Sequence, residues 1–140
     1  MFLDASIVVA ITMREQGWEA EYDKLQVAGP TYFYTATVRY EAVIAIARIS
    51  ALTKGARVDS EMLKAAEIVF DGFVDAVGAT EIAITQEIGR EALVAAGRYG
   101  KIVGHRAALN FGDCFSYAAA KSLKSGLLYK GRDFSETDLA

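Results

Sequence analysis

The 140-residue chain has very few of the residues that build disulfides and histidine-based metal sites. It contains one cysteine, one histidine and one proline. One cysteine excludes an internal disulfide, and it also excludes a cysteine-based structural zinc site, which needs four ligands. One histidine excludes the multi-histidine metal motifs, and a serine-protease-like triad would depend on that single residue. The sequence therefore does not belong to the disulfide-rich or zinc-dependent classes of small protein.

Long apolar runs and an excess of positive charge are also absent. No run reaches the roughly 18 apolar residues of a membrane span. The N-terminal stretch has no basic residue before its apolar part and is interrupted by Asp4, so we expect no signal peptide and a cytoplasmic protein. The 15 Lys and Arg residues face 18 Asp and Glu residues, and the net charge is −3. Bulk charge therefore gives no reason to expect a nucleic-acid-binding protein.

The order of apolar patterns predicts one α/β domain over residues 1–140. Hydrophobic residues make up 53% of the chain, which is ample for a core. Short apolar runs alternate with longer helical patterns, which is typical of a mostly parallel sheet of four to five strands flanked by helices in an α/β/α arrangement. We expect strands at 2–3, 31–35, 81–85 and 126–130, and helices at 6–14, 18–28 (ending at Gly29-Pro30), 35–54, 60–77, 85–99 and 112–124, with a loop at 100–110.

Four carboxylates fall near the same end of four of these elements. Asp4 follows the first strand, Asp133 follows the last, Asp113 lies at a helix N-terminus, and Glu41 lies in the first turns of the apolar helix after the second strand. In open α/β sheets, ligands bind beyond the carboxyl ends of the strands. Carboxylates that converge there repel one another unless a cation compensates them, and an all-oxygen ligand set suits Mg²⁺ or Mn²⁺. Such a site could hydrolyse a phosphodiester.

Each acid also has a purely structural interpretation. Asp4 and Asp113 occupy positions typical of helix caps. Asp133 lies in a Gly-Arg-Asp sequence typical of a turn. Glu41 could pair with an arginine of its own helix. No single acid decides between the two interpretations, and their shared position favours a common site.

Four segments together resemble a known family. They are FLDAS at 2–6, TATVRYEAV at 35–43, LNFGDCFSYAAAK at 109–121 and LLYKGRDFSETDL at 127–139. The sequence resembles the PIN-domain fold and, within it, the VapC-type toxins of bacterial toxin–antitoxin pairs. The resemblance implies an endoribonuclease that depends on Mg²⁺ or Mn²⁺, hydrolyses RNA with metal-activated water and is held inactive by a cognate VapB-type antitoxin. It also implies a homodimer.

The resemblance assigns roles to individual residues. The family's four acids fall on Asp4, Glu41, Asp113 and Asp133, with Asp4 and Asp113 as the principal metal ligands and the other two acting directly or through water. Two further residues would support the site: Ser6 matches a hydroxyl residue after the first acid, and Asp138 matches an acid near the end that either assists the site or caps the final turn.

One basic stretch precedes Asp113. It supplies four candidates for contact with the RNA backbone, with a solvated loop as the alternative. These candidates are Arg98, Lys101, His105 and Arg106.

Two other functions remain open for the same sequence. One is a PIN-like module that binds RNA or protein without catalysis, and the other is a housekeeping RNA-processing nuclease. The apolar helices at 36–54 and 60–77 could be core, or could contribute to a dimer contact and to a groove for the antitoxin.

Overall fold

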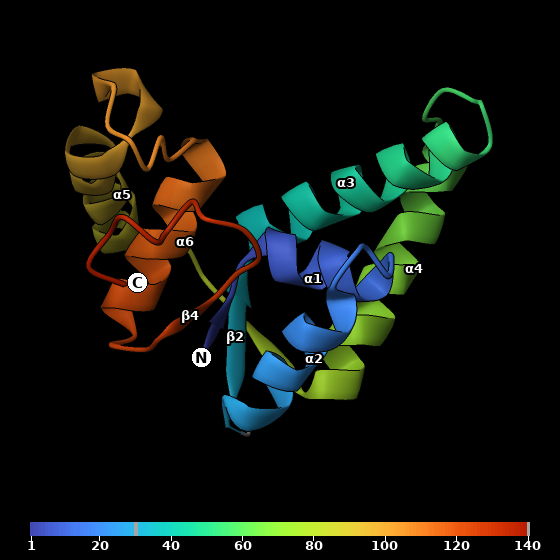
Figure 1. Ribbon diagram of the computed structural model, residues 1–140, viewed down its shortest axis with the longest axis horizontal. Coiled ribbons are helices and arrows are strands. Elements are labelled where there is room, and N and C mark those ends of the chain that lie inside the picture. Colours follow the sequence, from blue (N-terminus) through green and yellow to red (C-terminus); the bar gives the residue numbers. More distant parts are fainter. Residues whose placement is uncertain (30, 140) are drawn as a thin grey trace.

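The computed structural model describes residues 1–29 and 31–139, which form three layers (Figure 1). The elements in chain order are β1 (Phe2–Leu3), α1 (Ala5–Thr12), α2 (Trp18–Val27), β2 (Tyr32–Thr35), α3 (Ala36–Thr53), α4 (Ser60–Val77), β3 (Ala79–Ile82), α5 (Gln86–Tyr99), the 3-10 helix η1 (Lys101–Val103), α6 (Phe111–Ser122) and β4 (Leu127–Leu128). Helices α1 to α4 lie on one side of the sheet, and α5 and α6 lie on the other. The α/β/α prediction is confirmed, with four strands.

All neighbouring strands of the sheet are parallel, in the order β3-β2-β1-β4. Phe2 of β1 lies beside Phe33 of β2 on one side and beside Leu127 of β4 on the other. The chain builds β1, β2 and β3 toward one edge and then crosses to the opposite side of β1 to form β4. The strand order therefore reverses between β1 and β4, and ligands of open α/β sheets bind beyond the carboxyl ends of the strands at such a reversal.

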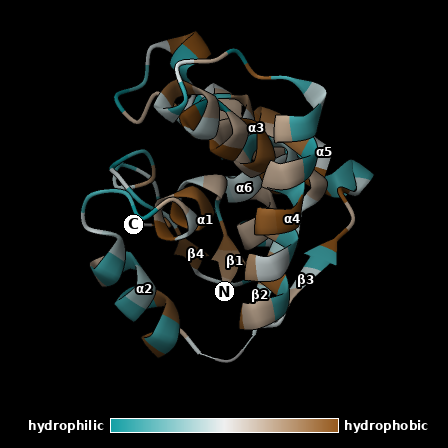
Figure 2. Ribbon diagram, turned by 90° about the vertical axis from the view of Figure 1, so that its right-hand side faces the viewer, coloured by the Kyte–Doolittle hydropathy of each residue, from teal (hydrophilic) through white to brown (hydrophobic). Residues whose placement is uncertain are grey.

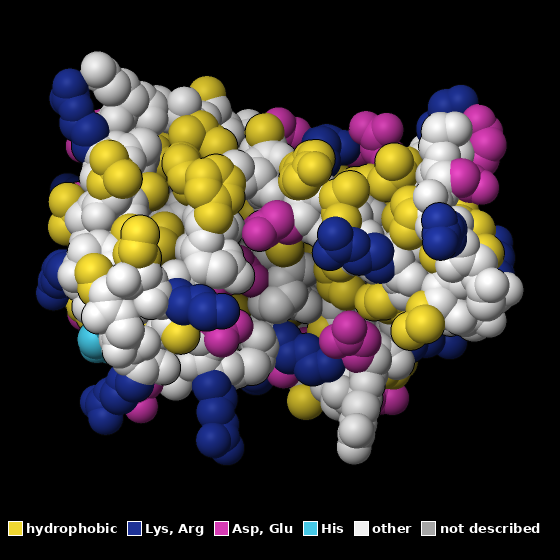
Figure 3. Space-filling model, turned by 90° about the horizontal axis from the view of Figure 1, so that it is seen from above, with side chains coloured by type: hydrophobic (Ala, Val, Ile, Leu, Met, Phe, Trp, Pro, Cys, Tyr) yellow, Lys and Arg dark blue, Asp and Glu magenta, His cyan; other side chains and the backbone are white. Residues whose placement is uncertain are grey.

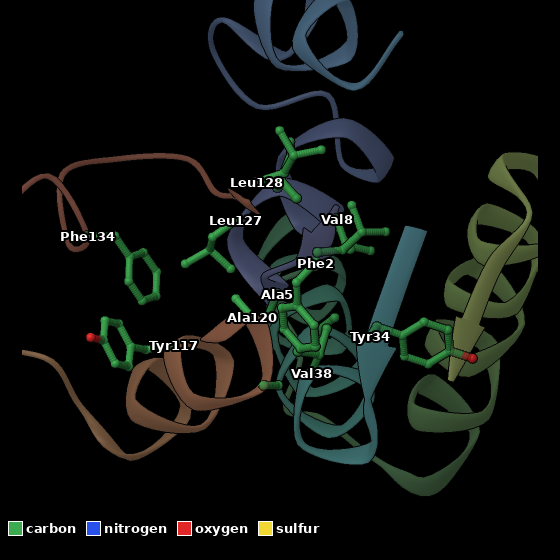
Figure 4. Close-up of a cluster of buried hydrophobic side chains, with 14 of the residues drawn as sticks. Phe2, Ala5, Val8, Tyr34, Val38, Tyr117, Ala120, Leu127, Leu128 and Phe134 are labelled. Atoms are coloured by element: carbon green, nitrogen blue, oxygen red, sulfur yellow. The ribbon is translucent and has the colours of Figure 1, made fainter. Parts of the chain in front are cut away.

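The core lies on both sides of β1 (Figure 4). Phe2 and Leu3 have no exposed surface, because strands flank β1 on both edges and helices cover both faces. Tyr117 of α6 packs on one side of the strand, and Val38 of α3 packs on the other. In Figure 2 the central strands are hydrophobic and α2 is mostly hydrophilic. Within the described residues, no helix combines the length and hydropathy that a bilayer span requires. The buried short strands therefore fix where their carboxyl ends lie.

The third strand begins two residues before the expected 81–85. Gly78 ends α4 in the left-handed conformation, with a φ of 68°, and the chain enters the sheet at the next residue. Thr85 does not extend the strand, because its hydroxyl accepts a hydrogen bond from the Ile88 N–H and caps α5. The cap was expected, and the strand boundary was wrong because Ile84 continues an apolar alternation into the linker.

Other boundaries shift by a few residues. The expected loop at 100–110 contains η1 and a bridge between Gly100 and Leu109. The last strand covers only Leu127–Leu128 of the expected 126–130. α2 ends at Val27; the prediction that Pro30 helps to end this helix lies outside the described residues. These differences leave the topology unchanged.

Candidate active site

Four carboxylates from four separate segments line one cleft at the carboxyl edge of the sheet. Asp4 follows β1, Glu41 lies in the second turn of α3, Asp113 lies in the first turn of α6, and Asp133 lies in the loop after β4. All four line a cleft of about 740 Å³, as does a fifth carboxylate, Glu15. Acidic side chains surround a hollow near the middle of the face shown in Figure 3. The structure therefore brings together the four acids that the sequence selected.

Asp4 is held by a short chain of hydrogen bonds. It is buried at the N-cap of α1, and its Oδ2 accepts hydrogen bonds from the Ser6 N–H at 2.9 Å and the Ser6 hydroxyl at 2.6 Å. The Ser6 hydroxyl oxygen in turn accepts a hydrogen bond from the Lys130 N–H at 3.0 Å. Ser6 thus fixes one oxygen of Asp4 and ties it to the loop that carries Asp133. The helix begins at Ala5, and Asp4 is its N-cap.

Asp113 is held by a capping box at the start of α6. Its Oδ2 accepts a hydrogen bond from the Asn110 N–H at 2.8 Å, and the Asp113 N–H donates to Asn110 Oδ1 at 3.1 Å. This arrangement satisfies two backbone donors at the helix N-terminus and orients the carboxylate. Asp113 therefore does act as a capping residue, and the same geometry leaves its Oδ1 facing no hydrogen-bond donor among the described residues.

Glu41 packs tightly against the first turn of α6. A Cβ atom added to Gly112 would lie 2.0 Å from Glu41 Oε1. Only glycine leaves room for the carboxylate at this position. The glycine that precedes Asp113 therefore allows α3 and α6 to bring their two acids to the same cleft.

Burial and mutual repulsion perturb two of the acids. Burial raises the pKa of Glu41 to about 7, and the negative charges of Asp4 and Asp113 raise it further. Burial also raises the pKa of Asp113 to about 6; the Asn110 N–H opposes this rise, and the charges of Asp4 and Asp133 add to it. The raised pKa values mean that burial, and then the negative charge of the neighbouring acids, disfavour the ionised forms of Glu41 and Asp113.

The donor set fits a hard divalent cation by its chemistry. The four acids offer only oxygen atoms, which Mg²⁺ and Mn²⁺ prefer. Within residues 1–29 and 31–139, no three Asp, Glu, His or Cys side chains are grouped closely enough to hold one ion together. The hydrogen bonds described above use only Oδ2 of Asp4 and of Asp113, so the two Oδ1 atoms have no donor partner among the described residues and would be available to an ion.

Two basic side chains also line the cleft, and neither was selected as a binding residue from the sequence. Arg48 is exposed and makes no ion pair with any described residue. Lys130 Nζ pairs with Glu15 at 2.8 Å. Arg48 follows Glu41 by seven residues on α3, so helical spacing could have placed it on the same face. Nothing in the sequence indicates that Lys130 turns toward the end of α1.

The basic stretch expected beside the metal lies outside the cleft. Arg98 covers the ring of Tyr99, His105 packs against the same ring, and Arg106 pairs with Glu136 at 2.7 Å. Lys101 lines a separate apolar pocket between α5 and α6. None of these four residues lines the cleft, and their contact with RNA stays a prediction.

Asp138 is also outside the cleft. It accepts a hydrogen bond from the Tyr117 hydroxyl at 2.6 Å and pairs with Lys121 at 3.0 Å. These bonds hold the pKa of Asp138 below its usual value, and they fasten the C-terminal segment to α6. Asp138 does not contact the acids. It instead anchors the segment that follows Asp133.

Comparison with known proteins identifies the family. A PIN domain model matches residues 1–139. The chain is 45% identical to a VapC ribonuclease of Rhizobium meliloti, over 99% of this chain and 98% of that protein. It is 31% identical to ribonuclease VapC28 of Mycobacterium tuberculosis, over 98% of this chain and 93% of that protein. The chain therefore belongs to the PIN domain family, and the relatives it resembles over nearly its whole length are VapC ribonucleases.

Solved structures agree with this assignment at the level of the fold. The Mycobacterium tuberculosis toxin VapC20, which cleaves the sarcin–ricin loop, matches with a TM-score of 0.69 and 14% identity, covering 96% of this chain and 92% of that one. A toxin–antitoxin complex from Klebsiella pneumoniae matches with a TM-score of 0.65 and 13% identity, covering 99% of this chain and 92% of that one. Both likenesses extend over nearly all of the fold described above.

Proposed function

We propose that this protein is an endoribonuclease that depends on Mg²⁺ or Mn²⁺ and acts as the toxin of a VapBC-type toxin–antitoxin system. The observation that carries the proposal is the convergence of Asp4, Glu41, Asp113 and Asp133 in one cleft at the carboxyl edge of the sheet. The full-length likeness to VapC ribonucleases supports RNA as the substrate and a toxin as the role.

The chain's own residues divide the work in this proposal. Asp4 and Asp113 would hold the ion, and Glu41 and Asp133 would complete the set directly or through water. Ser6 and Asn110 orient the two principal ligands. A divalent ion bound there makes water a stronger nucleophile and offsets negative charge on the phosphoryl oxygens. The absence of a histidine from the cleft fits this chemistry, because no separate histidine base is needed.

Hydrolysis of RNA by the purified protein tests the proposal. We expect cleavage of cellular RNA with Mg²⁺ or Mn²⁺ and none with excess chelator. Asp4→Asn and Asp113→Asn should each reduce the rate by about 10²-fold or more, the usual effect of removing one electrostatic contribution. Asp23→Asn, at an exposed position of α2, is the matched control. If neither active-site substitution changes the rate, these residues are not the metal ligands.

The expected partners follow from the same proposal. A cognate VapB-type antitoxin would block the cleft, and the protein would act as a homodimer. Exposed apolar side chains on α3 and α4 are consistent with such contacts: Leu52 is 82% exposed and Ile68 is 72% exposed. Growth arrest on expression, relieved by co-expression of the reading frame adjacent to the gene, supports the toxin. RNA cleavage without growth arrest supports a housekeeping nuclease, and binding without cleavage supports a non-catalytic module.

A further inference from the structure

An acidic cleft needs basic groups of its own to attract a polyanion. Among the described residues, only two Lys or Arg side chains line the cleft, Arg48 and Lys130. No side chain of the basic stretch that includes Arg98 and Arg106 lines the cleft. Arg48 and Lys130 are therefore the side-chain cations that a phosphate inside the cleft could meet.

Arg48 belongs to a stripe of α3 that faces the cleft. The cleft-lining residues of this helix are Tyr40, Glu41, Ile44, Ala45 and Arg48. They recur at intervals of three or four, which places them on one face of the helix. Seven residues separate Glu41 from Arg48, so the two lie about 10 Å apart along the helix axis. Arg48 is thus far enough from the acids to keep its charge available to a ligand, and it has no ion-pair partner.

Lys130 also lines the cleft, from the segment after β4. Its backbone lies beside Ser6, and its side chain extends to Glu15, which follows the end of α1. Glu15 cancels part of the charge of Lys130, and Arg48 adds a full positive charge nearby. One carboxylate partner leaves the Lys130 ammonium with N–H donors for a second anion.

We propose that Arg48 and Lys130 bind the RNA backbone on the side of the cleft away from the acids, and so align the strand along α3 for hydrolysis. This inference rests on the proposed ribonuclease function and adds the residues that hold its substrate. Phosphate contacts of this kind fix the register of the strand without reading its sequence. We therefore expect these two residues to set affinity for RNA in general.

The salt dependence of RNA binding tests the inference. A fluorescently labelled oligouridylate is titrated with the protein in Ca²⁺, and the binding constant K is measured over about 50 to 200 mM salt. A denaturing gel checks that the probe stays intact. Each phosphate contact on a single strand contributes about 0.7 to the slope of log K against log salt. We expect Arg48→Gln to lower the slope by about 0.7, and Arg48→Lys to preserve it. Arg57→Gln, at an exposed position between α3 and α4, is the control and should leave the slope unchanged.

Glu15→Gln gives an independent test in the opposite direction. Removing this carboxylate frees Lys130, so binding at low salt should become tighter. An unchanged slope in Arg48→Gln, or weaker binding in Glu15→Gln, would overturn the inference. Cleavage of cellular RNA in Mg²⁺ is measured separately. If the wild type cleaves RNA and Arg48→Gln keeps the wild-type salt slope, the RNA-binding inference is refuted and the ribonuclease function stands. If the wild type neither binds nor cleaves RNA, both the inference and the proposed function are refuted.

Discussion

Replacing Glu41 by Gln should stabilise the metal-free protein while it impairs hydrolysis. Glu41 is half-buried on α3 among other carboxylates, and its raised pKa shows that the folded state disfavours its negative charge. Glutamine has nearly the same shape and carries no charge. The substitution therefore removes a half-buried negative charge, and with it the cost of desolvating that charge and of its repulsion by Asp4 and Asp113.

The size and sign of this effect follow from proton linkage. The pKa of Glu41 rises from the usual 4.5 to about 7 in the folded protein. Between these values the folded state binds more protons than the unfolded state, so stability falls as pH rises through this range. The full rise corresponds to roughly 3 kcal/mol at 1.36 kcal/mol per unit. Solvent screening of a partly exposed group reduces the expected gain to about 1 to 2 kcal/mol above pH 7.

Urea unfolding in chelator at pH 5 and pH 8 measures the gain. Glu41→Gln should have the higher midpoint at pH 8, and the difference from wild type should shrink at pH 5, where the folded protein already protonates Glu41. Glu67→Gln, on an exposed position of α4, should change the midpoint little at either pH. Added Mg²⁺ should stabilise the wild type more than Glu41→Gln. A variant no more stable than wild type at pH 8, or an equal difference at both pH values, would refute the reasoning.

Three further substitutions separate the site from its scaffold. Gly112→Ala should lower the rate of RNA hydrolysis by tenfold or more without lowering the melting temperature, because its methyl group displaces only the flexible Glu41 carboxylate while alanine favours the helix. Phe134→Ala should destabilise the protein by about 3 to 5 kcal/mol in urea unfolding, since the ring is fully buried. Asp138→Asn should lower the free energy of unfolding by about 1 kcal/mol at neutral pH in the same assay. This loss should disappear as acid protonates the wild-type carboxylate, and an equal loss at pH 3 would contradict the assigned hydrogen bond and ion pair.

The acids of the cleft could be selected from the sequence because their positions are defined by nearby chain signals. Asp4 follows the short apolar pair Phe2-Leu3, which indicates a buried strand. Asp113 lies in the first turn of a helix, after Asn110 and Gly112. Parallel strands bring such positions to one edge whatever the detailed packing. Local patterns therefore predicted both the topology and the acidic set.

The basic residues could not be selected in the same way. The loop containing His105 is adjacent to Asp113 in the sequence, yet the direction of α6 separates them in space. Lys130 lines the cleft, and its N–H donates to Ser6, which is 124 residues away in the chain. Contacts of this kind depend on tertiary packing, and no periodicity or motif encodes them.

Ser6 links Asp4 to the segment that carries Lys130 and Asp133. Its hydroxyl donates to Asp4 and accepts from the backbone of Lys130, so one small side chain connects β1, α1 and the segment after β4. The same segment carries Asp133 into the cleft and Lys130 toward Glu15. A change in the position of Asp4 would therefore move an acid and a base of the opposite wall together. Ser6 and the β1–β4 pairing thus hold Asp4 and Lys130 in a fixed relation to each other.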